Sequence, residues 1–285
     1  MHTRSRSDTL VQLRAIVAGA PIPALTPLRY AETHAVWEAA SDQRGRLRDW
    51  LVAELPPLVA HVRDRPVAVL GVGVGDGSVD GPLAAALAAG GRRVDYAGVE
   101  PHPPSAGAVA ARLAGLGLPG LTITVQVTDF ASDAGTGPVD LVHFVHSLYY
   151  VGDVGAALDR ALDRLGPGGV LVALTAPLEP LCVLTDAVAP HEGHRQWFAE
   201  DVRAELPGRG LTVREAVIDG RLDLGAVRTD PAGTGEQLLD FLVQGRTGAL
   251  PAAARALLLA HLRDIALPGP GWVVPHPLHV AVVTR

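Results

Sequence analysis

From residue 67 onward, short apolar runs alternate with helix-forming stretches, and this alternation restricts the fold more than any other feature of the chain. The apolar runs are residues 67–70, 94–99, 121–127, 139–145 and 170–174. The helix-forming stretches between them include residues 82–89, 106–116 and 154–165. Runs of strand length that are apolar almost throughout are typical of a parallel sheet covered by helices on both faces.

The two ends of the chain extend this pattern. Residues 8–61 contain three predicted helices and no strand, and residues 235–266 contain two further helices. Residues 211–218 and 278–284 are β-branched and apolar enough to be two more strands. With the five internal runs, they bring the expected number of strands to seven.

These elements predict a single α/β domain over residues 1–285, with a Rossmann-like, doubly wound, mostly parallel seven-stranded sheet. Residues 1–61 form a helical cap in this prediction. Residues 62–285 form the core, with helical insertions on the substrate side. A chain of 285 residues that is 48% hydrophobic and 19% charged can bury one large core of this kind.

Charge, cysteine content and the length of apolar runs limit the classes of partner. The formal net charge of −6 argues against nucleic acid, because phosphate contacts need a basic face. Cys182 is the only cysteine, so no intrachain disulfide forms and a reducing compartment is expected. No signal sequence opens the chain and no apolar run reaches membrane-spanning length. We therefore expect a cytoplasmic monomer or homodimer without a membrane partner.

A glycine-rich loop follows the first strand and precedes the first helix of the alternating pattern. Gly71, Gly73 and Gly75 let a ligand approach the backbone, and the following helix supplies unpaired N–H groups. The spacing Gly-x-Gly-x-x-Gly of dinucleotide-binding loops would place its third glycine at Asp76. A carboxylate at this position is unfavourable beside the negatively charged pyrophosphate of a dinucleotide. S-adenosylmethionine instead carries a positively charged ammonium and sulfonium, so the loop favours this ligand. A plain tight turn is the alternative interpretation.

Acidic residues end the next two strands. Glu100 follows the second strand, where an acidic residue in a doubly wound sheet can bind both ribose hydroxyls. A solvent-facing glutamate at a strand end is the alternative. Asp129 and Phe130 follow the third strand, where a carboxylate and a ring could hold an adenine.

Together with residues 142–151, these residues resemble the class I methyltransferases, and more narrowly the histamine N-methyltransferase-like group. The similarity runs from about Leu28 to the C-terminus. Its more particular segments are Leu148-Tyr149-Tyr150-Val151, followed by an Asp-led helix, and residues 238–242.

The resemblance implies S-adenosylmethionine as the cofactor. The cofactor-contacting residues that it implies are Gly71, Glu100, Thr128, Asp129, Phe130 and Val145. The chain departs from most class I sequences at Val69, where an acidic residue often precedes the loop. Recognition of the methionine end is therefore partly unassigned.

The resemblance also implies a substrate site. Tyr30 and Glu32 match a segment of the family's cap in which a glutamate contacts the substrate amine. His146 stands where the family has a substrate-facing glutamine, and His276 where it has an amide side chain. Unlike an amide, an imidazole can accept a proton near neutral pH, so we predict Glu32, His146 and His276 as catalytic. Each histidine taken alone is equally compatible with an ordinary packed side chain.

Aromatic residues in the cap and sheet-edge segments could surround a flat or cationic substrate. The predicted substrate-binding residues are Tyr30, Tyr149, Tyr150 and Trp197. Ordinary core packing explains any one of them equally well. Because bacterial members of this broad group are associated with tryptophan-derived indoles, we expect methylation of a small nitrogen heterocycle, at carbon 3 or a ring nitrogen of an indole, in bacterial secondary metabolism.

Other functions remain open at this point. An imidazole or amine N-methyltransferase fits the same residues. An aminopropyltransferase would need a carboxylate-rich pocket, and residues 141–151 contain no acid. A non-catalytic cofactor-binding protein is disfavoured by the complete loop and Glu100. His191 and His194 could ligate zinc, but no cysteine or third ligand stands nearby, so no metal is expected.

Overall fold

The computed structural model describes residues 6–135, 137–189, 196–207, 209–269 and 271–284. Its chain divides into two compact units, which we name the sheet unit and the helical unit. The sheet unit consists of Gly45–Ala176, Trp197–Ile218 and Leu278–Arg285. The helical unit consists of Met1–Arg44, Pro177–Gln196 and Asp219–Pro277.

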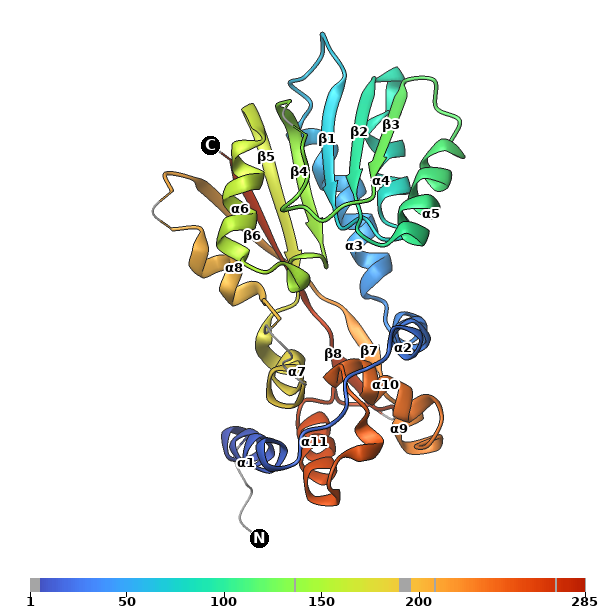
Figure 1. Cartoon of the computed structure of the whole chain (residues 1–285), viewed down its shortest axis with the longest axis vertical. Helices are drawn as coiled ribbons and strands as arrows, with labels where there is room; N and C mark the ends of the chain where they lie inside the picture. Colours follow the sequence, from blue (N-terminus) through green and yellow to red (C-terminus); the bar gives the residue numbers. More distant parts are fainter. Residues whose placement is uncertain (1–5, 136, 190–195, 208, 270, 285) are drawn as a thin grey trace. The chain divides into compact units, whose positions relative to one another are not determined.

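A seven-stranded sheet forms the centre of the sheet unit (Figure 1). Its strands are β1 (Val67–Val72), β2 (Val94–Val99), β3 (Leu121–Gln126), β4 (Val139–Val145), β5 (Leu165–Thr175), β6 (Thr212–Ile218) and β9 (Leu278–Thr284). Their order is β3-β2-β1-β4-β5-β9-β6, and only β9 runs antiparallel to its neighbours. The prediction of a mostly parallel, Rossmann-like, seven-stranded sheet is confirmed. The strand order reverses between β1 and β4, which is where ligands bind in such sheets.

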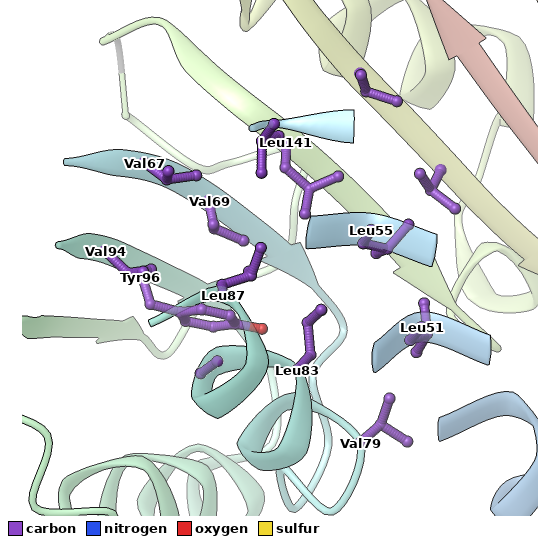
Figure 2. Packing of buried hydrophobic residues seen from close by; sticks show 14 of the residues in the cluster. Leu51, Leu55, Val67, Val69, Val79, Leu83, Leu87, Val94, Tyr96 and Leu141 are labelled. Atoms are coloured by element: carbon purple, nitrogen blue, oxygen red, sulfur yellow. The ribbon is translucent and has the colours of Figure 1, made fainter. Parts of the chain in front are cut away.

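Helices cover both faces of this sheet. They are α3 (Gln43–Leu58), α4 (Asp80–Leu87), α5 (Pro103–Ala114), α6 (Val154–Asp163) and α8 (Ala199–Glu205), with 3-10 turns η1 (Ala89–Gly91) and η2 (Leu148–Tyr150). Successive strand side chains point to opposite faces. Val69 of β1 therefore joins the buried cluster of Leu51 on α3 and Leu83 on α4 (Figure 2), whereas Leu70 joins a second cluster with Leu158 of α6. Burial on both faces explains why the strands are apolar throughout.

The third N-terminal helix packs with the sheet. Leu47, Leu51 and Leu55 of α3 recur every four residues, so they form one stripe along the helix, and all three are fully buried. They belong to the same cluster as the β1 side chains. The sequence had grouped residues 1–61 as one cap, and the structure divides them, because this apolar stripe is buried by strands.

The helical unit has its own core. Its elements are α1 (Arg6–Gly19), α2 (Pro27–Ala40), η3 (Leu178–Cys182), α7 (Val183–Val188), β7 (Arg221–Asp223), α9 (Ala226–Thr229), α10 (Thr234–Val243), η4 (Thr247–Ala249), α11 (Ala252–Asp264) and β8 (Val273–Pro275). Leu13, Leu184, Leu239 and Leu258 are fully buried in one cluster of this unit. β7 and β8 form a two-stranded antiparallel sheet. None of the helices in the described part of the chain is long and apolar enough to span a membrane.

Candidate active site

The glycine loop turns sharply between β1 and α4. Gly73, Gly75 and Gly77 have φ angles of 66°, 55° and 72°, in the left-handed region that glycine enters without a steric penalty. The amide of Gly73 donates a hydrogen bond to the carbonyl of Val99 at 2.8 Å. The loop is therefore bound to the end of the neighbouring strand β2.

Most glycines of this loop are required by the protein's own side chains. A Cβ at Gly71 would lie 2.6 Å from Tyr96 Oη, one at Gly73 would lie 2.5 Å from Ser147 Cβ, and one at Gly77 would lie 2.6 Å from Val109 Cγ2. At Gly75, by contrast, no atom of the described residues lies within 4 Å of the Cβ position. Space for a ligand against the backbone is therefore found at Gly75.

Glu100 holds the loop from the end of β2. Its side chain is buried, its Oε2 accepts a hydrogen bond from the Gly75 amide at 2.9 Å, and its Oε1 accepts one from the His102 amide at 2.9 Å. The structure thus brings together the glycine loop and the acidic residue at the end of the second strand. Each carboxylate oxygen has a second lone pair, so Glu100 can accept further hydrogen bonds from a ligand.

The residues after β3 form a turn. Asp129 is exposed, and its carboxylate accepts hydrogen bonds from the amide of Ser132 at 2.8 Å and from its hydroxyl at 3.1 Å. These bonds lower the pKa of Asp129. Phe130 is buried and meets Phe144 edge-on, with ring centroids 5.5 Å apart. Its ring belongs to the core of the sheet unit, while Thr128 is half-buried.

His146 follows the half-buried Val145 at the end of β4 and has a φ of 54°, which is uncommon for a residue with a side chain. Its Nδ1 lies 3.0 Å from Tyr149 Oη, which also accepts a hydrogen bond from the Ala176 amide at 2.6 Å. Which of the two groups donates in the pair of Tyr149 with His146 depends on the tautomer of the imidazole.

The other aromatic residues predicted near the substrate differ in exposure. Tyr150 is 55% exposed and meets Tyr149 edge-on at 6.1 Å. Trp197 is half-buried, and its Nε1 donates a hydrogen bond to the carbonyl of Val151 at 2.7 Å. Tyr149 and Trp197 therefore both bind backbone atoms of the sheet unit.

An aromatic face occurs within the helical unit, where α2 meets α10. Tyr30, His34 and Trp37 lie on one side of α2, since positions four and seven residues on return to the same face. Phe241 of α10 contacts all three, with ring centroids 5.6, 5.2 and 5.1 Å away, respectively. His276 extends the row, edge-on to Trp37 at 5.2 Å. We refer to these five residues as the aromatic face.

Asp240 fixes the pairing of these two helices. It is fully buried, and its carboxylate accepts hydrogen bonds from Arg29 Nη2 at 2.7 Å and Thr247 Oγ1 at 2.6 Å. Arg29 precedes Tyr30 on α2, and Asp240 precedes Phe241 on α10. This ion pair therefore aligns the rings of the aromatic face, which gives residues 238–242 a structural role that the sequence did not reveal.

His276 is buried and held by the start of α3. Its Nδ1 lies 2.7 Å from Ser41 Oγ, which also accepts a hydrogen bond from the Gln43 amide at 3.1 Å. The Ser41 hydroxyl donates to Nδ1 or accepts from it, according to which ring nitrogen carries the proton. Burial lowers the pKa of His276 from 6.5 to about 4, so the ring is neutral at physiological pH.

Glu32 lies elsewhere on α2. Its side chain is 49% exposed, and the closest ion pair is with Arg29 at 3.8 Å. Being two positions from Tyr30, it projects from the opposite side of the helix to the aromatic face. The predicted residues Tyr30, Glu32 and His276 belong to the helical unit, and all the others belong to the sheet unit. His191 and His194 lie outside the described residues.

A buried polar group in the sheet unit was not predicted. Tyr96 of β2 donates a hydrogen bond to Asp80 at the start of α4 and accepts one from His143 of β4 at 2.9 Å. All three are buried. Burial and Asp80 raise the pKa of Tyr96 well above its ordinary value, and burial lowers that of His143 to about 4. The sequence signals of this buried group were Tyr96 inside the apolar strand β2 and His143 inside the apolar strand β4.

Comparison with known proteins gives a match to one family model. Residues 70–171 match the family model described as a methyltransferase domain. The matched segment begins in β1 and ends in β5, so it contains the glycine loop, Glu100 and His146. Among curated proteins, none matches the sequence.

Several solved structures share the fold. YcgJ from Bacillus subtilis has a TM-score of 0.52 and 14% identity, covering 80% of this chain and 96% of its own. A putative methyltransferase from Bacillus halodurans has a TM-score of 0.52 and 15% identity, covering 81% and 98%. The plantazolicin methyltransferase BpumL, crystallised with SAH, has a TM-score of 0.53 and 10% identity, covering 98% and 97%. The chain thus has the α/β, Rossmann-like fold of these methyltransferases, and its residues 70–171 match the methyltransferase domain model.

Proposed function

We propose that this methyltransferase transfers the methyl group of S-adenosylmethionine to a small, flat nitrogen heterocycle. The substrate that we favour is a tryptophan-derived indole, methylated at carbon 3 or at the ring nitrogen, in bacterial secondary metabolism. The observation that carries the proposal is the aromatic face of the helical unit, where Phe241 contacts Tyr30, His34 and Trp37. Aromatic rings offer a flat substrate stacking surfaces, and they stabilise positive charge that develops on it.

The residues of the sheet unit fit the cofactor. Gly75 leaves open space against the backbone, and Glu100 is an acceptor beside it for the ribose hydroxyls. Asp129 and Thr128, after β3, are accessible to an adenine. When bound, S-adenosylmethionine supplies an electrophilic methyl group on its sulfonium sulfur. The chain's own residues then hold the acceptor close and aligned and exclude water.

Three residues are proposed to handle charge and protons. Glu32 is an exposed carboxylate on the opposite side of α2 from the aromatic face, so its proposed role, accepting a hydrogen bond from a substrate N–H and stabilising positive charge, requires the substrate to reach that side of the helix. Either His146 or His276 is proposed to remove or relay the substrate proton. In each ring Nδ1 pairs with a hydroxyl, that of Tyr149 for His146 and that of Ser41 for His276, so Nε2 is the nitrogen that we propose meets the substrate proton. If His276 is the base, the rate falls on the acid side only near pH 4, where that ring is protonated.

The decisive experiment is incubation of the purified protein with labelled S-adenosylmethionine and a panel of indoles, imidazoles and aliphatic amines. The proposal predicts label in an indole, and a raised KM with an unchanged cofactor Kd in the variant Phe241→Ala. Preferential labelling of imidazoles or amines would instead support the N-methyltransferase alternative, within the histamine N-methyltransferase-like group. Labelling of no flat heterocycle would contradict the proposal.

A further inference from the structure

The order of the strands sets the direction in which the proposed cofactor lies. Asp129 follows β3, Glu100 follows β2 and the glycine loop follows β1, and these strands are adjacent in the order β3-β2-β1-β4. The carboxyl ends of parallel strands meet at one edge of the sheet, where ligands bind. With the adenine at β3 and the ribose at β2, the methionyl part lies at the ends of β1 and β4.

Ser147 lies at this position, two residues beyond the end of β4. A Cβ added at Gly73 would lie 2.5 Å from Ser147 Cβ and 3.3 Å from its Oγ, so the serine side chain rests directly against the glycine loop. This contact holds the end of β4 beside the end of β1. It also explains why position 73 excludes any residue with a Cβ.

The hydroxyl of Ser147 is buried, and among the residues that the structure describes it has no hydrogen-bond partner. A hydroxyl in this state has lost its bonds to water without replacing them, which is unfavourable. If this side chain served only for packing, an alanine would fill the position without burying an unpaired hydroxyl. The orphan hydroxyl therefore indicates a partner that the protein chain itself does not supply.

We propose that the Ser147 hydroxyl binds the methionyl end of S-adenosylmethionine, whose ammonium is a hydrogen-bond donor and whose carboxylate is an acceptor. A hydroxyl can serve either group. This assignment rests on the proposed cofactor and supplies a contact for the methionine end, for which Val69 offers no charge. It gives Ser147 a role in affinity for the amino-acid part of the cofactor alone.

Calorimetric titration of Ser147→Ala with three ligands tests the assignment. S-adenosylmethionine and S-adenosylhomocysteine carry the methionyl ammonium and carboxylate, whereas 5′-methylthioadenosine lacks both. We expect the first two to bind about tenfold more weakly to the variant, the usual effect of losing a hydrogen bond to a charged group. Affinity for 5′-methylthioadenosine should be unchanged. Ser7→Ala, at an exposed position on α1, is the matched control and should bind all three ligands like the wild type.

The stability of the ligand-free variant provides a second readout. Removing an orphan hydroxyl should leave the thermal midpoint of Ser147→Ala equal to or above that of the wild type, whereas a structural hydroxyl would lower it. Equal weakening of all three ligands, or of none, would overturn the assignment, as would a lowered midpoint. If the wild-type protein binds none of the three ligands, the proposed cofactor itself is wrong, which is a different outcome.

Discussion

The sheet unit and the helical unit hold their candidate functional residues by different means. In the sheet unit, backbone amides do this work: the amides of Gly75 and His102 bind Glu100, and that of Ser132 binds Asp129. In the helical unit, the aromatic face depends on contacts between rings, such as Tyr30 with Phe241. Backbone hydrogen bonds fix polar atoms at defined points, whereas ring packing tolerates shifts in position. The first suits a constant cofactor, and the second suits a variable acceptor.

The largest expected effect is a loss of folding stability at acid pH, caused by one buried histidine in each unit. Burial lowers the pKa of His143 and of His276 from 6.5 to about 4. Because the unfolded chain binds these protons more readily, the stability that each neutral ring contributes is fully present above pH 6.5. It is lost as the pH falls toward 4, at about 3 kcal/mol for each ring. Urea unfolding at pH 7 and at pH 4.5 measures the loss.

Matched variants separate the two units. His143→Gln places an amide nitrogen near the position of Nε2, and His276→Asn places a polar atom near that of Nδ1, so each can keep one hydrogen bond without titrating. Each variant should lose about half of the acid sensitivity of the wild type. An unchanged pH dependence in His276→Asn alone would show that this ring is hydrated and that the two units differ in burial.

The next prediction compares two glutamates, beginning with the exposed one. Glu32→Gln keeps the shape of the side chain and removes its charge, so methyl transfer to the best substrate should fall about a hundredfold if the carboxylate stabilises developing charge. Stability should change by less than about 1 kcal/mol, because the ion pair with Arg29 is exposed. Initial rates at saturating cofactor provide the measurement. A fully active variant would make Glu32 a solvated surface residue.

For the buried glutamate we expect losses of cofactor affinity and of folding stability. Glu100→Ala removes a charged acceptor from the proposed ribose site, so affinity for S-adenosylmethionine should fall about tenfold to a hundredfold. It also leaves the Gly75 and His102 amides without their acceptor, which lowers stability by about 1–3 kcal/mol. Calorimetric titration and urea unfolding test these two effects separately. Unchanged affinity in a folded variant would remove Glu100 from the site.

Sequence patterns located the sheet unit well because its elements are regular and its polar groups lie close in sequence. The predicted strands at 94–99, 139–145 and 278–284 have the bounds of β2, β4 and β9. The loop and Glu100 follow successive strands, and their contact arises from parallel pairing of β1 with β2. A rule about strand ends was therefore sufficient to place both.

The helical unit was harder to predict because its contacts join distant segments. β7 and β8 are three residues long and about 50 positions apart, so neither shows a period in the sequence. Phe241 meets Tyr30 beside the ion pair of Asp240 with Arg29, and residues so far apart in the sequence meet only in the tertiary structure. The glycines show the same limit. The sequence marked Gly71 as a ligand-facing residue, but whether a missing Cβ makes room for a ligand or for Tyr96 depends on residues from another strand.

The smallest expected effects distinguish these two uses of glycine within the sheet unit. Gly71→Ala would place a Cβ 2.6 Å from Tyr96 Oη and 2.9 Å from His143 Cε1, so overpacking should cost about 1–3 kcal/mol of stability. Gly75→Ala meets no described atom within 4 Å, and only its φ of 55° is unfavourable, at about 1–2 kcal/mol. The two variants should therefore differ in ligand binding more than in stability. Cofactor affinity per folded molecule should stay near the wild-type value for Gly71→Ala, since its Cβ points into the core, and should fall for Gly75→Ala, whose Cβ enters the open space. The reverse order of affinities would mean that the ligand approaches the backbone at Gly71, and that the Tyr96 and His143 side chains move when it binds.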